Sequence, residues 1–119
     1  RSDGTPVRDY MHVSDVVNAY LRIADHMDRT DVVGKAFNFG TGKPSSVLNL
    51  VNKIIEISGK SHLKPVILGK EVKMINEQYL SSDRANSLLK WKANKSLEDG
   101  LRETIEWYSA NESLWKHLI

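Results

Sequence analysis

Apolar residues repeat every three or four positions in three stretches of the chain, which is the spacing that places them on one face of a helix. These stretches predict helices from residue 14 or 15 to 27, from 45 or 46 to 57, and from 96 to about 108. A Ser or Asp stands at the start of each helix, where it can cap free backbone amides, and Gly59 is a natural stop for the second. A shorter helix is predicted over residues 82–89.

Three short segments have the composition of strands. Residues 8–13 alternate polar and apolar side chains, residues 36–39 form an apolar run that ends in Gly40, and residues 65–68 begin with a proline followed by branched side chains. Residues 69–81 show no clear pattern. The sum is a small mixed unit of helices and short strands, of the α/β or α+β class, and residues 1–119 are expected to form a single domain.

The composition excludes several classes of protein. The chain has 119 residues, of which 40% are hydrophobic and 27% charged, as in an ordinary globular domain. Its 17 basic and 15 acidic side chains are mixed along the sequence, so we expect no nucleic-acid partner. No apolar run reaches the ~20 residues that cross a bilayer, and the N-terminus lacks a secretory signal. Together with the absence of cysteine, these features predict a cytoplasmic protein without a membrane partner.

Few residues form a recognisable catalytic motif. Gly40 and Gly42 are half of a phosphate-binding fingerprint, but the next glycine position is Ser45, so a strand-to-helix turn is the simpler interpretation. The four histidines are widely separated, and we expect no metal site. There is no Gly-x-Ser-x-Gly motif for a serine hydrolase. Among the aromatic residues near the C-terminus, Trp115 is the candidate for an exposed contact, and the others are predicted to pack in a core.

Five blocks occur in the order found in one enzyme family. They are residues 8–15 (RDYMHVSD), 34–42 (GKAFNFGTG), 46–51 (SVLNLV), 82–85 with 89–91 (SDRA and LKW) and 96–108 (SLEDGLRETIEWY). The chain resembles the C-terminal portion of the extended short-chain dehydrogenases/reductases that act as NAD-dependent nucleotide-sugar epimerases and dehydratases. The ending Glu77–Leu80 looks most like CDP-glucose 4,6-dehydratase, and UDP-glucose 4-epimerase comes next.

This resemblance implies that the chain is a substrate-binding lobe from which the N-terminal Rossmann domain is absent. NAD would be bound by that missing domain, with no cofactor held by this chain. The family's Tyr-x-x-x-Lys pair does not occur here, so we expect no catalytic residues and no activity from the chain alone. The implied partners are a nucleotide-diphosphate sugar, the missing domain, and a second copy in a homodimer of the intact enzyme. Because part of the lobe packs on that domain in these enzymes, we expect apolar surface near residues 10–13 and 37–39 to be left exposed in this chain and to drive self-association.

The resemblance assigns substrate binding to Arg8. A guanidinium is always charged and offers a planar fork of donors, which suits a diphosphate. The alternative is an ordinary surface ion pair with a neighbouring acid. Asp15 is interpreted as a helix cap and not as a ligand-binding group.

Four further residues are weaker candidates for the substrate site. Tyr10 and His12 are expected to orient the strand and to face the domain junction. Many relatives carry a second diphosphate-binding arginine upstream of the block at residue 82, where this chain has none. Lys73 is a candidate substitute for it, and Gln78 follows in the same stretch. Lys90 stands where relatives have a glycine, which predicts a local change in the turn.

Overall fold

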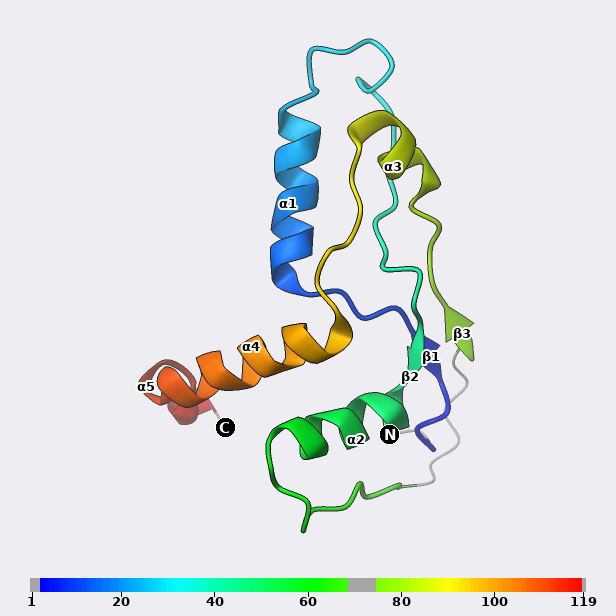
Figure 1. The fold of residues 1–119 in the computed structure, drawn as a ribbon. Coiled ribbons are helices and arrows are strands. Elements are labelled where there is room, and N and C mark those ends of the chain that lie inside the picture. Colours follow the sequence, from blue (N-terminus) through cyan, green and yellow to red (C-terminus); the bar gives the residue numbers. More distant parts are fainter. Residues whose placement is uncertain (1–2, 69–74, 119) are drawn as a thin grey trace.

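The computed structural model describes residues 3–68 and 75–118 (Figure 1). These residues form three strands of two residues each, five α-helices and a terminal 3₁₀ turn. In chain order the elements are β1 (Val7–Arg8), α1 (Val13–Ala24), β2 (Ser45–Ser46), α2 (Val47–Ile57), β3 (Glu77–Gln78), α3 (Asp83–Leu89), α4 (Leu97–Ala110), α5 (Glu112–Trp115) and η1 (Lys116–Leu118). The mixed helix and strand fold predicted from the sequence is confirmed.

The three strands form a small sheet with the order β2-β1-β3. β1 pairs with β2 in the antiparallel sense and with β3 in the parallel sense. The central strand therefore joins two segments that lie far from it in the sequence. The sheet fixes the position of β1 and therefore of Arg8, where the first of the five blocks begins.

Two of the three predicted strands are wrong. Residues 36–39 and 65–68 are in neither helix nor strand, whereas β3 lies within the stretch that showed no pattern. A strand needs a neighbouring backbone to satisfy its amide and carbonyl groups, and the described residues supply none for residues 36–39. Phe37 and Phe39 pack instead against the core, so the expectation that they are left exposed is also wrong.

The starts of α2 and α4 follow the cap signals, and those of α1 and α3 do not. Ser82 stands at the N-cap of α3, but its side chain makes no capping bond. The hydroxyl of Ser46 accepts a hydrogen bond from the amide of Asn49 at 3.1 Å, and Ser96 caps α4 in the same way. α1 begins one residue earlier than predicted, because the imidazole of His12, and not Ser14 or Asp15, accepts the capping bond from the amide of Ser14. The helix ends at Ala24, three residues before the predicted end.

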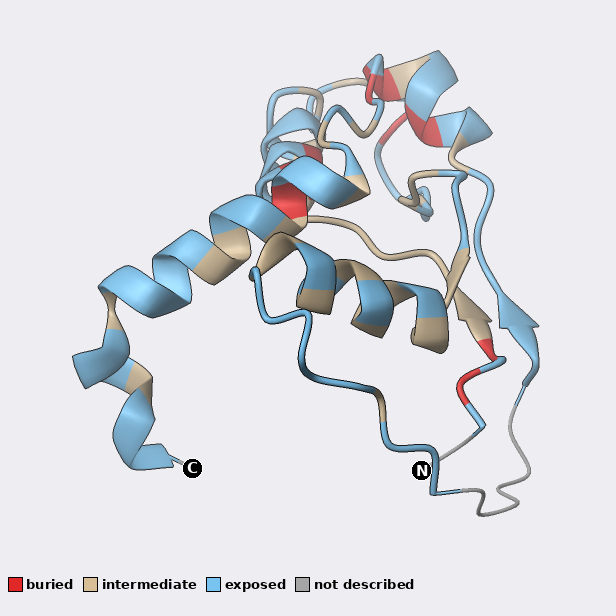
Figure 2. Ribbon diagram, turned by 60° about the horizontal axis from the view of Figure 1, so that its bottom comes forward, coloured by how far each residue is buried: buried red, intermediate tan, exposed pale blue. Residues whose placement is uncertain are grey.

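A small core lies between α1, α3 and the segment that follows α3 (Figure 2). Its fully buried members are Ala19, Val32, Ala85, Leu89 and Trp91. The ring of Phe39 meets that of Trp91 edge to face with centroids 4.8 Å apart. This is a favourable arrangement of two aromatic quadrupoles, and it gives the unpaired segment near residue 39 a fixed position.

Asp15 fastens α1 to the chain that leads into α4. Its side chain is only 5% exposed, and its two carboxylate oxygens accept hydrogen bonds from the amides of Asn94 and Lys95, each at 3.1 Å. The indole N–H of Trp91 donates to the backbone carbonyl of Asp15 at 3.3 Å. The carboxylate of Asp15 therefore binds backbone amides of a distant loop and does not cap its own helix.

Two basic residues shape the ends of α1 and α3. Arg29 holds Asp31 through both carboxylate oxygens and donates to the carbonyl of Leu88 at 2.9 Å, which ties the loop after α1 to α3.

Lys90 adopts the left-handed conformation at a φ of 53° at the end of α3. That conformation favours glycine, so the lysine keeps a glycine-type cap at a cost in strain.

The chain as a whole is less compact than an ordinary domain of its length. The radius of gyration is 17.4 Å, against about 13.5 Å for a compact domain of this length. The accessible surface is 9027 Å², whereas a compact monomer of 13.5 kDa exposes about 6,500 Å². α4 projects away from the core and carries α5 at its far end (Figure 1). The exposed surface that α4 presents accounts for part of this excess.

The aromatic residues of the C-terminal arm differ from their prediction. Trp107 and Tyr108 are 50% and 48% exposed, although the sequence placed them in a core. Trp115, predicted to be exposed, is half-buried and donates its indole N–H to the carbonyl of Tyr108 at 2.8 Å. Helical spacing identified an apolar face on α4, but the described residues cover only part of it.

Candidate functional site

Arg8 lies in the central strand of the sheet and is half-buried. Its guanidinium donates to the backbone carbonyls of Val7 at 2.7 Å, Ile75 at 2.9 Å and Asn76 at 3.5 Å. The fork of donors therefore faces the chain that enters β3. The surface ion pair that was the alternative is not among its contacts in the described part of the chain.

Of the two candidates from the β3 region, the described residues include Gln78 but not Lys73. Gln78 is the register partner of Arg8 on the neighbouring parallel strand, and it is exposed. The structure therefore brings these two predicted residues together. Lys73 lies outside the described residues.

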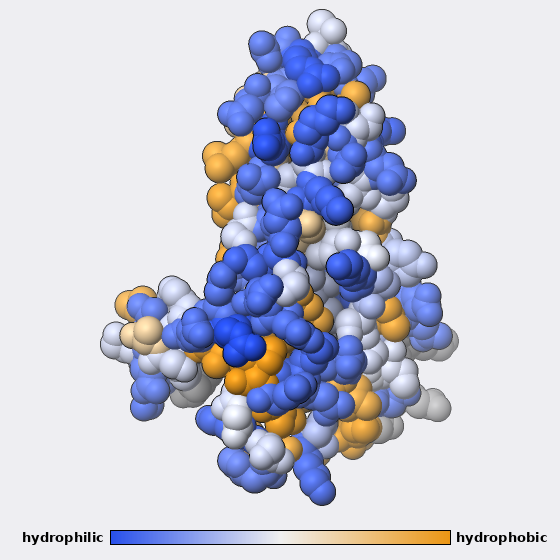
Figure 3. Space-filling model, in the orientation of Figure 1, coloured by the Kyte–Doolittle hydropathy of each residue, from blue (hydrophilic) through white to orange (hydrophobic). Residues whose placement is uncertain are grey.

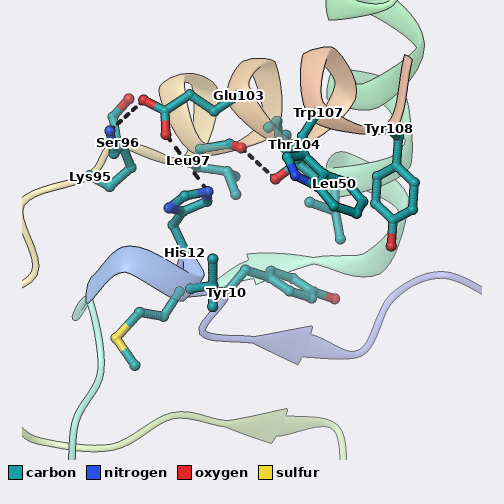
Figure 4. Close-up of a pocket in the computed structure, with 14 residues that line it drawn as sticks. Tyr10, His12, Leu50, Lys95, Ser96, Leu97, Glu103, Thr104, Trp107 and Tyr108 are labelled. Carbon is teal, nitrogen blue, oxygen red and sulfur yellow. Dashed lines mark hydrogen bonds and ion pairs between the residues drawn. The ribbon is translucent and has the colours of Figure 1, made fainter. Parts of the chain in front are cut away.

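Tyr10 and His12 line a groove beneath α4 (Figure 4). The groove has a volume of about 580 Å³ and is bounded by the segment between β1 and α1, by Leu50 of α2 and by one face of α4. Thr104 and Trp107 lie across it from Tyr10. Tyr10 and His12 thus face a cavity, and α4 closes its far side.

A polar network occupies one end of this groove. His12 is 14% exposed, shares a hydrogen bond of 2.8 Å with the hydroxyl of Ser14, and lies 3.9 Å from a carboxylate oxygen of Glu103. The other oxygen of Glu103 accepts a hydrogen bond from Lys95 at 2.5 Å, which raises the pKa of that lysine. The imidazole is therefore fixed by α1 on one side and by α4 on the other.

Gly100 allows this close approach of α4. It is buried within the helix, and a methyl group there would lie 3.2–3.3 Å from side-chain atoms of His12. Glycine within a helix is unfavourable by roughly 0.5–1 kcal/mol relative to alanine. Its position here is explained by the imidazole that packs against it.

The glycine turn at residues 40–42 is held by two polar side chains. The amide of Gly42 donates to the carboxylate of Asp9 at 3.0 Å, and Asp9 also bonds the hydroxyl of Thr41. The amide of Gly40 donates to the hydroxyl of Ser82 at 2.7 Å. The amides that a phosphate loop would offer to a ligand are already bonded within the chain, in agreement with a turn.

Sequence reasoning missed Asp9, Ser82 and Glu103 as residues that hold the site together. Asp9 immediately follows Arg8 in the resemblance block, which was the available signal, because its partners Thr41 and Gly42 lie 32 and 33 positions away. Ser82 and Glu103 act on residues 42 and 91 positions away, respectively, and local spacing carries no information on such pairs.

Among residues 3–68 and 75–118, no three His, Asp or Glu side chains form a group that could hold a metal ion. In the same residues, no helix has the length and apolar character of a membrane span.

Sequence comparison finds one enzyme family. Residues 1–40 match the family described as "NAD dependent epimerase/dehydratase family". UDP-glucose 4-epimerase 4 of Oryza sativa is 36% identical over 110 residues, which cover 92% of this chain and 29% of that protein. The bifunctional protein gal10 of Schizosaccharomyces pombe is 33% identical over 92% of this chain and 16% of its own length. The chain therefore spans less than a third of these relatives.

Solved structures give the same result for the fold. UDP-glucose 4-epimerase of Thermotoga maritima, determined with UDP-glucose, superposes with a TM-score of 0.77 at 32% identity over 93% of this chain and 34% of that one. The dTDP-glucose 4,6-dehydratase of Bacillus anthracis, determined with NAD, has a TM-score of 0.77 at 28% identity over 99% and 36%. In its sequence and in its fold, the chain matches the NAD-dependent epimerase/dehydratase family of extended short-chain dehydrogenases/reductases.

Proposed function

We propose that this chain is the nucleotide-sugar-binding portion of an NAD-dependent sugar-nucleotide epimerase or 4,6-dehydratase. The observation that carries the proposal is the position of Arg8. The guanidinium lies in the central strand, half-buried, with its donors fixed by backbone carbonyls of residues 75 and 76. A planar cationic fork held in this way suits the diphosphate of a nucleotide sugar.

Binding of a diphosphate at Arg8 requires an exchange of partners. Neutral carbonyl oxygens of Ile75 and Asn76 accept its hydrogen bonds in the structure. A phosphate carries the opposite charge and can accept two parallel bonds from the guanidinium, whereas the carbonyl acceptors are uncharged, so phosphate oxygens can displace these carbonyls. Tyr10, His12 and Gln78 lie near this strand or along the adjacent groove and would line the remainder of the substrate site.

NAD belongs to polypeptide outside this chain in our proposal. The described residues do not fit a dinucleotide site, because the carboxylate of Asp9 binds the amide of Gly42 and would repel a phosphate at the glycine turn. The chain also has no Tyr-x-x-x-Lys pair to remove a proton from the sugar. We therefore expect the chain to be inactive alone, and the intact enzyme to be a cytoplasmic homodimer that carries NAD on its other portion.

A stand-alone binding module is the second candidate. It is favoured by the small complete core around Trp91, which gives part of the chain a fixed structure of its own. Such a module would bind the nucleotide sugar without chemistry. Reading the codons upstream of residue 1 separates the two, because the enzyme requires an NAD-binding Rossmann domain there, and a stop codon or an unrelated domain would end the enzyme proposal.

Calorimetry with UDP-glucose and CDP-glucose tests the binding role of Arg8. In the polypeptide that contains the upstream portion, Arg8→Ala should weaken binding by roughly 2–4 kcal/mol, because it removes charge-assisted bonds to phosphate. Arg8→Lys should recover only part of the loss, since an ammonium cannot bind two oxygens in a plane. Arg22→Ala, on the exposed face of α1, is the matched control and should leave the affinity unchanged. Equal affinities for Arg8→Ala and the control would remove Arg8 from the site.

Analysis of the products distinguishes the two reactions. A 4-epimerase inverts the configuration at carbon 4 and leaves the mass of the sugar unchanged. A 4,6-dehydratase expels one water molecule and yields a 4-keto-6-deoxy sugar. Mass spectrometry of the nucleotide sugar after incubation with the intact enzyme therefore assigns the reaction.

A further inference from the structure

Asp9, the residue that follows Arg8, binds a distant turn through both of its carboxylate oxygens. One oxygen accepts a hydrogen bond from the hydroxyl of Thr41, and the other accepts one from the amide of Gly42 at 3.0 Å. The hydroxyl of Thr41 also accepts a bond from the amide of Lys43 at 3.1 Å. Both partners of Asp9 are therefore donors, and a carboxylate is the side chain that offers two acceptor oxygens and no donor.

Gly40 lies where the chain segments that follow β1 and β3 meet. A Cβ at this position would lie 2.7 Å from a carboxylate oxygen of Asp9 and 3.1 Å from the backbone carbonyl oxygen of Leu80, so there is no room for a side chain. The hydroxyl of Ser82 accepts a bond from the amide of Gly40 at 2.7 Å and donates to its carbonyl at 3.0 Å. On the face drawn in Figure 3, hydrophobic side chains gather between α4 and α2, whereas hydrogen bonds hold this junction.

The strand pairing that positions Arg8 is short. β1 and β3 contain two residues each, whereas strands in globular proteins usually have about five or six. The guanidinium adds bonds to the carbonyls of Ile75 and Asn76, but a bound phosphate would displace these bonds. The junction at Gly40 is a contact between the ends of the two strands that a phosphate at Arg8 leaves in place.

We propose that Asp9 is a positioning residue for diphosphate binding. It fixes the end of β1 to the junction at Gly40 and so holds Arg8 beside β3 while the guanidinium exchanges carbonyl partners for phosphate. This inference rests on the proposed function. A donor that is held in place before the ligand arrives loses less conformational freedom on binding. The two neighbouring residues thus have different roles, because Arg8 contacts the diphosphate and Asp9 acts through Arg8.

Calorimetry with UDP-glucose and CDP-glucose tests this role in the polypeptide that contains the upstream portion. Asp9→Asn should raise the dissociation constant about tenfold, because its amide nitrogen places a donor against Thr41 or Gly42 and one hydrogen bond is lost. Asp3→Asn is the matched control. The carboxylate of Asp3 also accepts bonds from a nearby threonine, Thr5, but it is exposed and precedes β1, so the dissociation constant should not change. An unchanged dissociation constant for Asp9→Asn would overturn the proposal, and so would a lower one, which would mean that the carboxylate mainly repels the phosphate.

A double-mutant cycle separates positioning from a general loss of stability. At a temperature at which all variants are folded, Asp9→Asn should raise the dissociation constant no further in the Arg8→Ala background, because Asp9 acts through the guanidinium. The same factor in both backgrounds would overturn the proposal. If Arg8→Ala alone leaves the affinity unchanged, the proposed binding role of Arg8 fails as well. If Arg8→Ala weakens binding and Asp9→Asn does not, only this inference fails.

Thr41 provides a second pair of variants that keeps the carboxylate. Thr41→Val should raise the dissociation constant about threefold, because one of the two bonds to Asp9 is lost and the bond from Gly42 remains. Thr41→Ser keeps the hydroxyl and should retain the original dissociation constant. Equal dissociation constants for the valine and serine variants would contradict the proposal.

Discussion

The two ends of this molecule differ in how completely their tryptophan residues are covered. In the core beside α3, Trp91 is 1% exposed and meets Phe39 edge to face, and both carboxylate oxygens of Asp15 accept hydrogen bonds. Along α4, Trp107 and Tyr108 are half-exposed, although the helix is well capped and regular. A regular helix thus reflects local sequence signals such as its cap, whereas burial depends on contacts with distant parts of a polypeptide.

The comparison between Trp91 and Trp107 gives the largest expected effect. Trp91→Ala should lower the free energy of unfolding by about 3–5 kcal/mol, because it leaves a large cavity and removes the contact with Phe39. Trp107→Ala should cost less than about 1 kcal/mol in the isolated chain. Urea unfolding followed by circular dichroism measures both, and similar costs would mean that the two ends are equally packed.

Asp15 provides a sharper test of the covered end. Asp15→Ala should cost about 2–4 kcal/mol, because the amides of Asn94 and Lys95 lose a charged acceptor in a buried position. Asp28→Asn, at an exposed position after α1, serves as the control and should change stability by less than about 0.5 kcal/mol. The same urea titration applies, and a cost for Asp15→Ala no larger than the control would show that the buried carboxylate does not hold the loop.

The local elements were predictable and the distant pairings were not. Ser46 and Ser96 precede their helices directly, so cap and helix are encoded within a few residues. The partners of Asp15 lie 79 and 80 positions away, and the carbonyls bonded to Arg8 lie 67 and 68 positions away. No periodicity carries information over that distance.

The same distinction explains the strand errors and the candidate site. Residues 36–39 have the composition of a strand, but a strand forms only where a neighbour offers free backbone groups. Arg8 was identified through the resemblance of its block to a family, not through spacing. Its role in substrate binding stays a prediction, and the structure adds the half-buried position and fixed orientation of its guanidinium.

Lys90 tests whether the covered end carries avoidable strain. Lys90→Gly should raise the free energy of unfolding by about 1 kcal/mol, because glycine adopts the left-handed conformation without the steric cost of a Cβ. Lys92→Gly, in the exposed segment two residues later, should instead be neutral or slightly destabilising, since it only adds freedom to the unfolded chain. Thermal unfolding compares the two, and a loss of stability for Lys90→Gly would contradict the strain.

The smallest expected effect is a dependence of stability on acid pH at the loop after α1. The hydrogen bonds from Arg29 lower the pKa of Asp31 below its ordinary value of 3.8. A lowered folded-state pKa contributes stability that is present above the unfolded value and lost as the pH falls through the folded one. Asp31→Asn should therefore flatten the stability curve below about pH 4 and leave its shape at neutral pH unchanged. Asp25→Asn is the control, and an identical slope in both variants would exclude a contribution from Asp31.

Hydrogen exchange along α4 tests the central claim most directly. In the isolated 119-residue chain, the amides of Ala19 to Ile23 in α1 should be well protected, and those of Glu103 to Ala110 in α4 should exchange much faster. In the polypeptide that carries the NAD-binding portion, protection of α4 should rise to that of α1. Slow exchange along α4 already in the isolated chain, or no change on adding the remaining polypeptide, would contradict a lobe that is completed by the rest of the enzyme.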